Sequence, residues 1–253
     1  MVEKRMRTLL RYPGGKSRAV KYLREYIPDD VSEICSPFFG GGALEIALAE
    51  EGIKIQAYDK FDLLVEFWQC AIESPENLAD EVSKLYPLSN DKFRELQATI
   101  YDLPSKIERA AAFYALNRSS FSGTTLSGGM SKGHPRFTES SIERLRNFKS
   151  KNISIDVACF TESIPKNKDK FLYCDPPYYI ESKLYGVKGN AHAEFDHVRL
   201  SELLKERDGW ILSYNNCDEI KELYKEYEIV YPEWSYGMNK SKKSSEILIL
   251  NYG

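Results

Sequence analysis

The chain has 253 residues, of which 42% are hydrophobic and 29% charged, and this composition is typical of an ordinary soluble protein. The net charge of −3 argues against a generally basic nucleic-acid coat, and no apolar run is long enough to span a bilayer. The length suits one large domain, or a core with a substantial insertion.

The first elements predict an α/β fold. Residues 31–35 read as a short apolar strand, the loop SPFFGGG follows, and residues 43–51 have helical periodicity with Gly52 as a C-cap. Residues 53–58 predict the next strand, which ends at Asp59. A strand, a helix and a second strand in this order imply a parallel sheet.

The pattern then becomes helical from residue 61 to about residue 118, and Pro75, Pro87 and Pro104 interrupt it. Residues 119–138 are rich in Ser, Thr and Gly, which predicts a loop or an irregular hairpin. A helix over 140–151 closes this stretch. The chain is therefore expected to carry an insertion at about 61–150.

Strand patterns resume after the insertion and alternate with helices. Strands are predicted over 153–157, 171–174 and 210–214, and helices over 196–206 and 218–226. Two final strands, near 228–234 and 246–252, could form a hairpin around the basic loop MNKSKK. These segments complete an α/β core that the insertion divides.

Positive charge is concentrated in two segments. Residues 1–24 carry eight Lys or Arg against one Glu, a net of +7, and residues 117–151 carry seven against two, a net of +5. Such segments could meet a polyanion, or they could be two solvated faces. The charge alone leaves both interpretations open.

The cysteines and the N-terminus indicate a cytoplasmic protein. Five scattered cysteines form no CxxC or Cys/His ligand set, so we expect reduced thiols and no structural metal. The opening residues MVEKRMRTLL lack a signal-peptide pattern. We therefore expect no metal and no association with a membrane.

Ligands of open α/β sheets bind at the carboxyl ends of the strands, where the first loop is Ser36–Gly42. Its three glycines allow a ligand to approach the backbone closely, although a merely tight turn would also use them. A nicotinamide fingerprint counted from Gly40 and Gly42 would end at Glu45 instead of glycine, which weakens a dehydrogenase interpretation.

Asp59 follows the second strand at the same edge. An acid here can accept hydrogen bonds from both ribose hydroxyls of a nucleoside cofactor, or it can cap the helix that follows. The glycine loop one strand earlier favours the nucleoside.

The third loop is Asp175-Pro176-Pro177-Tyr178, directly after an apolar strand. Each residue before a proline is restricted to extended geometry, so the loop is stiff. It holds the Asp175 carboxylate and the Pro176 carbonyl as two acceptors beside the flat ring of Tyr178. Two acceptors and a stacking face suit an exocyclic amino group on a planar ring.

The chain at this point resembles the Dam-type, α-class DNA adenine N6-methyltransferases. Asp-Pro-Pro-Tyr is a signature of amino-methyltransferases that use S-adenosylmethionine. Four further segments are similar to family motifs in the expected order: RYPGGKS at 11–17, PFFGGG at 37–42, Asn117-Arg118 with FSG at 121–123, and EILI at 246–249. The resemblance covers nearly the whole chain and is weakest over 61–110.

The resemblance implies a Rossmann-like methyltransferase core over 1–60 and 151–253, with a mostly parallel sheet and a C-terminal antiparallel strand. A mainly helical target recognition domain would be inserted at 61–150. The implied partner is double-stranded DNA, from which the target adenine is flipped out, and a cognate restriction enzyme is a further possible partner.

Site roles are implied residue by residue. The catalytic group would be Asp175, Pro176 and Tyr178, which hold the target base. The S-adenosylmethionine site would comprise the aromatic, glycine and charged side chains of Tyr12, Lys16, Phe38, Gly40, Gly42, Asp59, Phe160 and Asp175. DNA would be contacted by Asn117, Arg118 and Arg136, although Arg118 could instead brace its own helix.

Several other activities use some of the same residue types. Gly15-Lys16-Ser17 could end a nucleotide-binding P-loop, but Leu10 stands where its first glycine is required. A cytosine C5-methyltransferase needs a Pro-Cys nucleophile, which the chain lacks. Cytosine N4-methylation and a catalytically silent DNA-binding relative stay as alternatives. Many family members read GATC, but the loop GTTLSGGMSKGHPRF departs from the expected reading hairpin, so the target sequence is open.

Overall fold

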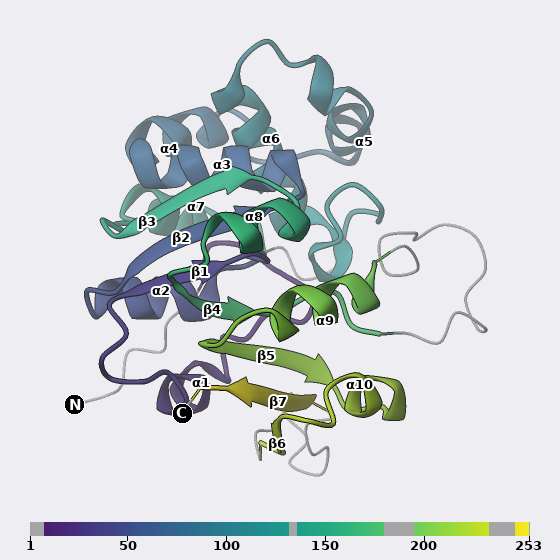
Figure 1. Ribbon diagram of the computed structural model, residues 1–253. Coiled ribbons are helices and arrows are strands. Elements are labelled where there is room, and N and C mark those ends of the chain that lie inside the picture. The colour runs from purple at the N-terminus through teal and green to yellow at the C-terminus, as the bar shows by residue number, and fades with distance from the viewer. Residues whose placement is uncertain (1–7, 132–135, 180–194, 233–245, 253) are drawn as a thin grey trace.

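One mixed sheet organises the fold. A computed structural model describes residues 8–131, 136–179, 195–232 and 246–252. Within these ranges the sheet has seven strands in the order β3-β2-β1-β4-β5-β7-β6 (Figure 1). Their bounds are β1 Glu33–Ser36, β2 Lys54–Asp59, β3 Ile153–Val157, β4 Phe171–Cys174, β5 Trp210–Asn215, β6 Glu228–Val230 and β7 Glu246–Asn251.

Strands β1 to β5 are parallel, and β7 runs antiparallel to both of its neighbours, β5 and β6. Strands β2 and β3 follow on one side of β1, and β4 and β5 follow on its other side. The reversal lies between β1 and β4, where open α/β sheets bind their ligands. The predicted parallel core with a C-terminal antiparallel strand is confirmed.

Both faces of the sheet are buried because successive strand residues alternate between two apolar clusters. Ile34 and Tyr173 belong to one cluster, whereas their neighbours Cys35, Leu172 and Cys174 belong to the other. The central strands therefore read as continuous apolar runs, as the sequence of β4 does.

Helices cover the two faces unequally. The smaller set packs on the face of Cys35 and lies in front of the sheet in Figure 1: α8 Phe160–Lys166, α9 His197–Lys205 and α10 Asp218–Leu223. The other face is covered by α1 Val20–Glu25, α2 Ala43–Glu50 and the inserted helices.

The insertion is helical, as predicted. It contains α3 Asp62–Glu73, α4 Pro75–Ser83, α5 Asn90–Thr99, η1 Ile100–Asp102, α6 Lys106–Ser119, η2 Phe121–Gly123 and α7 Glu139–Arg146. Local caps mark its helix starts: the hydroxyls of Ser89, Ser105 and Thr138 each accept a backbone N–H of the following turn. The described part of 119–138 is an irregular hairpin with a bridge from Ser120 to Met130.

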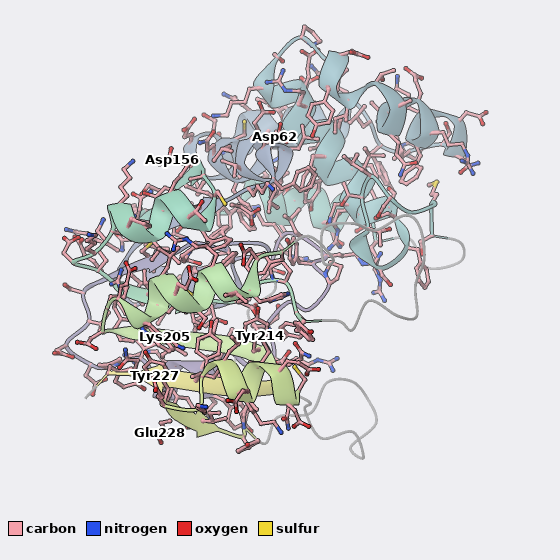
Figure 2. The ribbon with its side chains drawn as sticks, turned by 45° about the vertical axis from the view of Figure 1, so that its right-hand side comes forward. Asp62, Asp156, Lys205, Tyr214, Tyr227 and Glu228 are labelled. Carbon is pink, nitrogen blue, oxygen red and sulfur yellow. The ribbon has the colours of Figure 1, made fainter. Side chains whose placement is uncertain are left out.

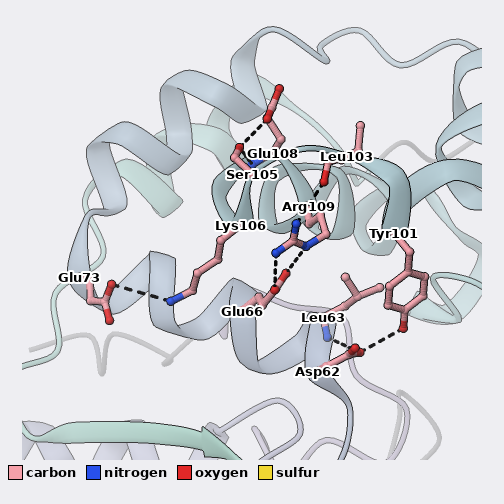
Figure 3. A network of polar contacts seen from close by, with 10 residues as sticks. All are labelled: Asp62, Leu63, Glu66, Glu73, Tyr101, Leu103, Ser105, Lys106, Glu108 and Arg109. Carbon is pink, nitrogen blue, oxygen red and sulfur yellow. Dashed lines mark hydrogen bonds and ion pairs between the residues drawn. The ribbon is translucent and has the colours of Figure 1, made fainter.

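The inserted helices share their core with the sheet. Helix α3 packs against β2 and β3, and a bidentate pair between Arg109 and Glu66 joins α6 to α3 (Figure 3). Figure 2 shows Asp62 among these helices and Glu228 at the far edge of the sheet. The division into 1–60 with 151–253 and 61–150 stays a prediction.

Several elements differ from the sequence prediction. The helix expected over 140–151 ends at Arg146, because Asn147 leaves helical geometry and its amide bonds the Glu143 carbonyl. Strand β6 ends at Val230, and the tip of the expected hairpin lies outside the described residues. Helices α1 and α8 were not predicted, since α1 has six residues and α8 contains Pro165. No described helix has the length and apolar character that a bilayer crossing requires.

Candidate active site at the strand ends

The loops after β1 and β2 are joined by Asp59. One carboxylate oxygen accepts the Gly40 N–H at 3.0 Å, and the other accepts the Phe61 N–H at 2.9 Å. Burial raises the pKa of Asp59, and these backbone donors oppose the rise. Each oxygen retains a second lone pair for a ligand. The structure thus brings two of the predicted cofactor residues into direct contact.

Tyr12 lies across the same loop. Gly40 has φ +50°, and a Cβ at this position would lie 2.8 Å from the Tyr12 ring. Partial burial, with the charges of Asp59 and Asp175 nearby, raises the pKa of the Tyr12 hydroxyl. The ring is 42% exposed. Glycine at position 40 is therefore required both by its backbone angle and by the ring that covers it.

An aromatic group flanks the loop on the α8 side. The ring centroids of Phe38 and Phe160 are 5.7 Å apart, and Phe195 lies 5.7 Å from the first and 5.0 Å from the second. Phe160 is 7% exposed, whereas Phe38 and Phe195 are half-buried. Phe195 was missed by the sequence analysis, because no motif surrounds it.

Lys16 and Asp175 meet at the switch between β1 and β4. The Lys16 ammonium lies 2.8 Å from Asp175 Oδ1, 2.7 Å from the Tyr178 hydroxyl and 3.4 Å from Glu246 Oε1. The Tyr178 hydroxyl also donates to Glu246. Lys16 is 4% exposed and Glu246 6%. Three residues singled out in the sequence are thus assembled with Glu246, which begins the EILI motif and had been given no role in the site.

The charges of this group are interdependent. Burial raises the pKa of Asp175, and the Lys16 ammonium opposes this rise. For Lys16, burial alone would lower the pKa, but the carboxylates of Asp175 and Glu246 raise it above its ordinary value. Lys16 therefore stays charged and forms ion pairs with two carboxylates. A P-loop lysine would instead bind the phosphates of a nucleotide.

Asn215 fixes the tyrosine that follows Tyr178. Its side-chain oxygen accepts the Tyr179 N–H at 2.9 Å, and its amide nitrogen donates to the Tyr179 carbonyl at 2.9 Å. The preceding residue, Tyr214, lies at this end of β5 beside α9, and its hydroxyl contacts His197 Nδ1 (Figure 2). The loop after β4 is thus clamped from β5, a contact that the sequence could not reveal.

A buried carboxyl lies behind the glycine loop. Glu45, in the first turn of α2, is 3% exposed and accepts a hydrogen bond of 2.6 Å from the Ser36 hydroxyl. Burial raises its pKa to about 7, although the bond from Ser36 lowers it. Glu45, which stands where the nicotinamide fingerprint requires glycine, therefore links α2 to the start of the glycine loop at Ser36.

Asn117 is 1% exposed, and its amide is used inside the protein. Its oxygen accepts the Arg11 N–H at 2.8 Å, and its nitrogen donates to Arg11 O, Gly123 O and Thr125 Oγ1. A Cβ at Gly123 would lie 2.2 Å from the Arg11 carbonyl, so the two segments are in close contact. The side chain predicted to contact DNA instead positions the loop that follows α6.

Arg118 and Arg136 are brought together. The Arg118 guanidinium donates two hydrogen bonds, of 3.0 and 2.7 Å, to the Arg136 carbonyl. Burial lowers the pKa of Arg118, and the charges of Arg144, Arg11 and Arg136 add to this effect. The second basic segment of the sequence thus meets one residue of the first. Arg118 thus binds the end of the loop at Arg136 and not its own helix, which was the alternative considered for it.

The group suits transfer to a neutral amino nitrogen. Asp175 is a partly exposed acceptor, at 21%, on a loop stiffened by two prolines. Burial raises the pKa of the preceding Cys174, so this thiol is a poor nucleophile. Among the described residues no three His, Cys, Asp or Glu side chains are grouped as metal ligands would be.

Comparisons with known proteins agree with this arrangement. The sequence pattern of the family described as "D12 class N6 adenine-specific DNA methyltransferase" matches residues 12–238. The type II methyltransferase M1.LlaDCHI of Lactococcus lactis subsp. cremoris is 27% identical, over 98% of this chain and 96% of its own length.

Two further relatives are similar at lower identity. The type II methyltransferase M.CviBI of Paramecium bursaria Chlorella virus NC1A is 24% identical, over 88% of each chain. A DNA adenine methylase of Vibrio cholerae is 22% identical, over 88% of this chain and 86% of its own.

Proposed function

Because the chain belongs to the D12 class of N6 adenine-specific DNA methyltransferases, we propose that its strand-end site methylates the amino nitrogen of an adenine flipped out of double-stranded DNA, with S-adenosylmethionine as donor. The observation that carries the proposal is the 2.8 Å contact of Lys16 with Asp175, which joins the N-terminal segment of Tyr12 and Lys16 to the Asp-Pro-Pro-Tyr loop. The family is adenine-specific, which disfavours cytosine N4 as the acceptor.

The residues at the edge fit the proposed donor. The backbone turns at Gly40 and Gly42, both with positive φ, and a Cβ at these positions would collide with the rings of Tyr12 and Phe39, so the turn requires glycine. Asp59 would accept the ribose hydroxyls, Phe38 and Phe160 would pack on the adenine ring, and Tyr12 would cover the loop. When bound, S-adenosylmethionine supplies an electrophilic methyl group on a sulfonium.

The protein would make the amino nitrogen a nucleophile by positioning. Asp175 and the Pro176 carbonyl would accept its two hydrogens, which favours a tetrahedral nitrogen whose lone pair points away from the ring. Transfer would form the bond from this nitrogen to the methyl carbon and break the bond from that carbon to sulfur, and the surplus amino proton would pass to the Asp175 carboxylate or to solvent. In-line placement supplies much of the acceleration. Tyr178 would stack on the extruded base.

The DNA would lie along an arginine cluster that the insertion forms together with Arg11 of the N-terminal segment. Arg11, Arg118, Arg136 and Arg144 are close enough to affect one another's charge, and such a cluster suits phosphates. Phe121, in η2 next to Arg118, is 68% exposed. We therefore retain 61–150 as the target recognition domain, with Asn117 as its internal support.

The biological role and the cellular location are also proposals. The relatives named type II methyltransferases favour a restriction-modification role with a cognate restriction enzyme as partner. All five cysteines are free, which fits the reducing cytoplasm expected for a DNA-modifying enzyme.

The function is tested by product analysis. Purified protein is incubated with tritiated S-adenosylmethionine and unmethylated genomic DNA, and the DNA is digested to nucleosides. The label should appear in N6-methyldeoxyadenosine, and the Asp175→Ala variant should incorporate none while keeping its thermal unfolding. Label in N4-methyldeoxycytidine, or turnover by the Asp175→Ala variant, would contradict the proposal.

A further inference from the structure

Glu246 occupies an unusual position for a charged residue. It is the first residue of β7, pairs with Asn215 of β5 in the ladder, and is 6% exposed. Its Oε1 is shared by the Lys16 ammonium, at 3.4 Å, and the Tyr178 hydroxyl. Buried carboxylates are rare unless they are paired, and Lys16 and Tyr178 provide such partners for Glu246.

From these contacts we propose that Glu246 is a positioning residue for methyl transfer. It neutralises Lys16 and anchors the Tyr178 hydroxyl, which leaves Asp175 available to the amino group of the target base. This inference rests on the function proposed above, and it assigns to Glu246 no contact with base or donor.

The charge balance gives the first reason. One ammonium faces two carboxylates, Asp175 at 2.8 Å and Glu246 at 3.4 Å, within a buried group. With Asp175 as its only carboxylate partner, Lys16 would compete directly with the incoming amino group for the same oxygens. A second carboxylate lets Lys16 keep a counter-ion while Asp175 turns toward the substrate.

The hydroxyl of Tyr178 gives the second reason. It accepts from Lys16 at 2.7 Å and donates to Glu246, so both of its hydrogen-bonding directions are used. The Lys16 ammonium also lies 5.0 Å from the Tyr178 ring centroid. A ring fixed before the base arrives loses less freedom on binding than a rotating one.

The sheet does not need the charge of Glu246. Its backbone is held by the β5–β7 ladder, which runs from Asn215–Glu246 to Trp210–Asn251, and the next four residues are buried apolar side chains. A neutral glutamine of equal size can still accept from Tyr178. Loss of the charge is therefore expected to alter the site more than the fold.

The first experiment compares Glu246→Gln with Glu66→Gln. Glu66 forms a bidentate pair with Arg109 in the insertion, with contacts of 2.6 and 2.8 Å, and is a matched control for removing a paired carboxylate (Figure 3). Glu246→Gln should lower kcat about 10- to 100-fold with KM for DNA and for S-adenosylmethionine nearly unchanged. Glu66→Gln should keep kcat, and both should keep the secondary structure seen by circular dichroism.

The second experiment asks whether Glu246 acts through Lys16. Single-turnover rates are measured for Glu246→Gln, Lys16→Met and the double variant. Glu246→Gln should lower the single-turnover rate far less in the Lys16→Met background, because the ammonium that Glu246 pairs with is already absent. Equal costs in both backgrounds, or a kcat of Glu246→Gln within about twofold of wild type, would overturn the inference.

Two safeguards keep the result interpretable. If Glu246→Gln fails to fold, Tyr178→Phe removes the hydroxyl alone, and wild-type kcat in that folded variant would overturn the anchoring role. If the wild-type protein itself transfers no methyl group to adenine, the proposed function fails. Wild-type transfer that Glu246→Gln leaves intact refutes only the role of Glu246.

Discussion

Arg11 and Asn117 exchange two hydrogen bonds across 106 residues of sequence: the Arg11 N–H donates to the Asn117 side-chain oxygen at 2.8 Å, and the Asn117 amide donates to the Arg11 carbonyl at 2.9 Å. Tyr12, the next residue, lies on the glycine loop. The end of α6 is therefore bound to the strand-end site by one buried side chain.

The arginines of the insertion should divide into two roles. Arg136→Ala is expected to impair the choice among DNA sites, since a bidentate contact with guanine contributes about 1–3 kcal/mol of discrimination. Arg118→Ala should weaken DNA binding evenly and lower the salt slope by about 1, because it removes one positive charge from the proposed phosphate contacts.

The measurement is turnover on the mapped site and on its single-base variants, with affinity followed against salt. Arg199→Ala, an exposed arginine of α9 paired with Glu202, is the control. Wild-type preference and affinity in both insertion variants would place the reading surface elsewhere.

Asp59 should govern affinity for the methyl donor. Asp59→Ala removes the acceptor of the Gly40 N–H and the proposed ribose contact, so binding should weaken by about 1.5–3 kcal/mol in titration calorimetry. Asp156→Ala is the matched control, because this exposed acid lies on β3 (Figure 2) and its carboxylate accepts a hydrogen bond from the Gln56 side chain. An unchanged affinity for Asp59→Ala would remove this residue from the site.

Phe121 should assist extrusion of the base. Its ring is 68% exposed beside the arginine cluster, and apolar side chains of this kind insert between base steps. Phe121→Ala should reduce the fluorescence rise of 2-aminopurine placed at the target position, with stacking worth about 1–3 kcal/mol. Tyr101→Ala removes an aromatic ring that is 59% exposed elsewhere on the insertion. Equal signals from the two variants would argue against a role for Phe121.

Glu45 should make stability depend on pH. Burial raises its pKa from 4.5 to about 7, so the folded protein binds an extra proton between these values and loses stability as pH rises through about 7. The Glu45→Gln variant lacks this loss. Its stability relative to wild type should increase from pH 4.5 to pH 8, by up to about 3 kcal/mol.

Urea unfolding at pH 5 and pH 8 measures the difference. The glutamine can still accept from Ser36, so the hydrogen bond is preserved. The same difference at both pH values would show that Glu45 ionises normally.

Elements whose residues form an apolar or alternating run between polar turns were predictable from the sequence. Strand β3 coincides with the predicted residues 153–157, and β4 with 171–174, because both are short runs bounded by polar turns. Helix α8 was missed because Pro165 lies within it, and α1 because it has no side-chain N-cap. The end of α7 was placed too late, since the capping bond of Asn147 leaves no pattern in the sequence.

The site was predictable only where a local motif carries the chemistry. Asp175 and Lys16 stand in such motifs, and their ion pair agrees with them. Glu246 stands in the EILI motif and Asn215 in none, and the sequence assigned a site role to neither, because their partners lie far away in the chain. Asn117 was expected at the DNA surface because burial of an amide cannot be read from its neighbours.

The position of β7 has a consequence for how the protein is made. This strand lies between β5 and β6, and the described part of β6 pairs with β7. A nascent chain that has released β5 but not β7 holds β6 without its neighbour and Lys16 without Glu246, 230 residues away. Since domains consolidate from the N-terminus during synthesis, the contact between Lys16 and Glu246 forms only after β7 has left the ribosome.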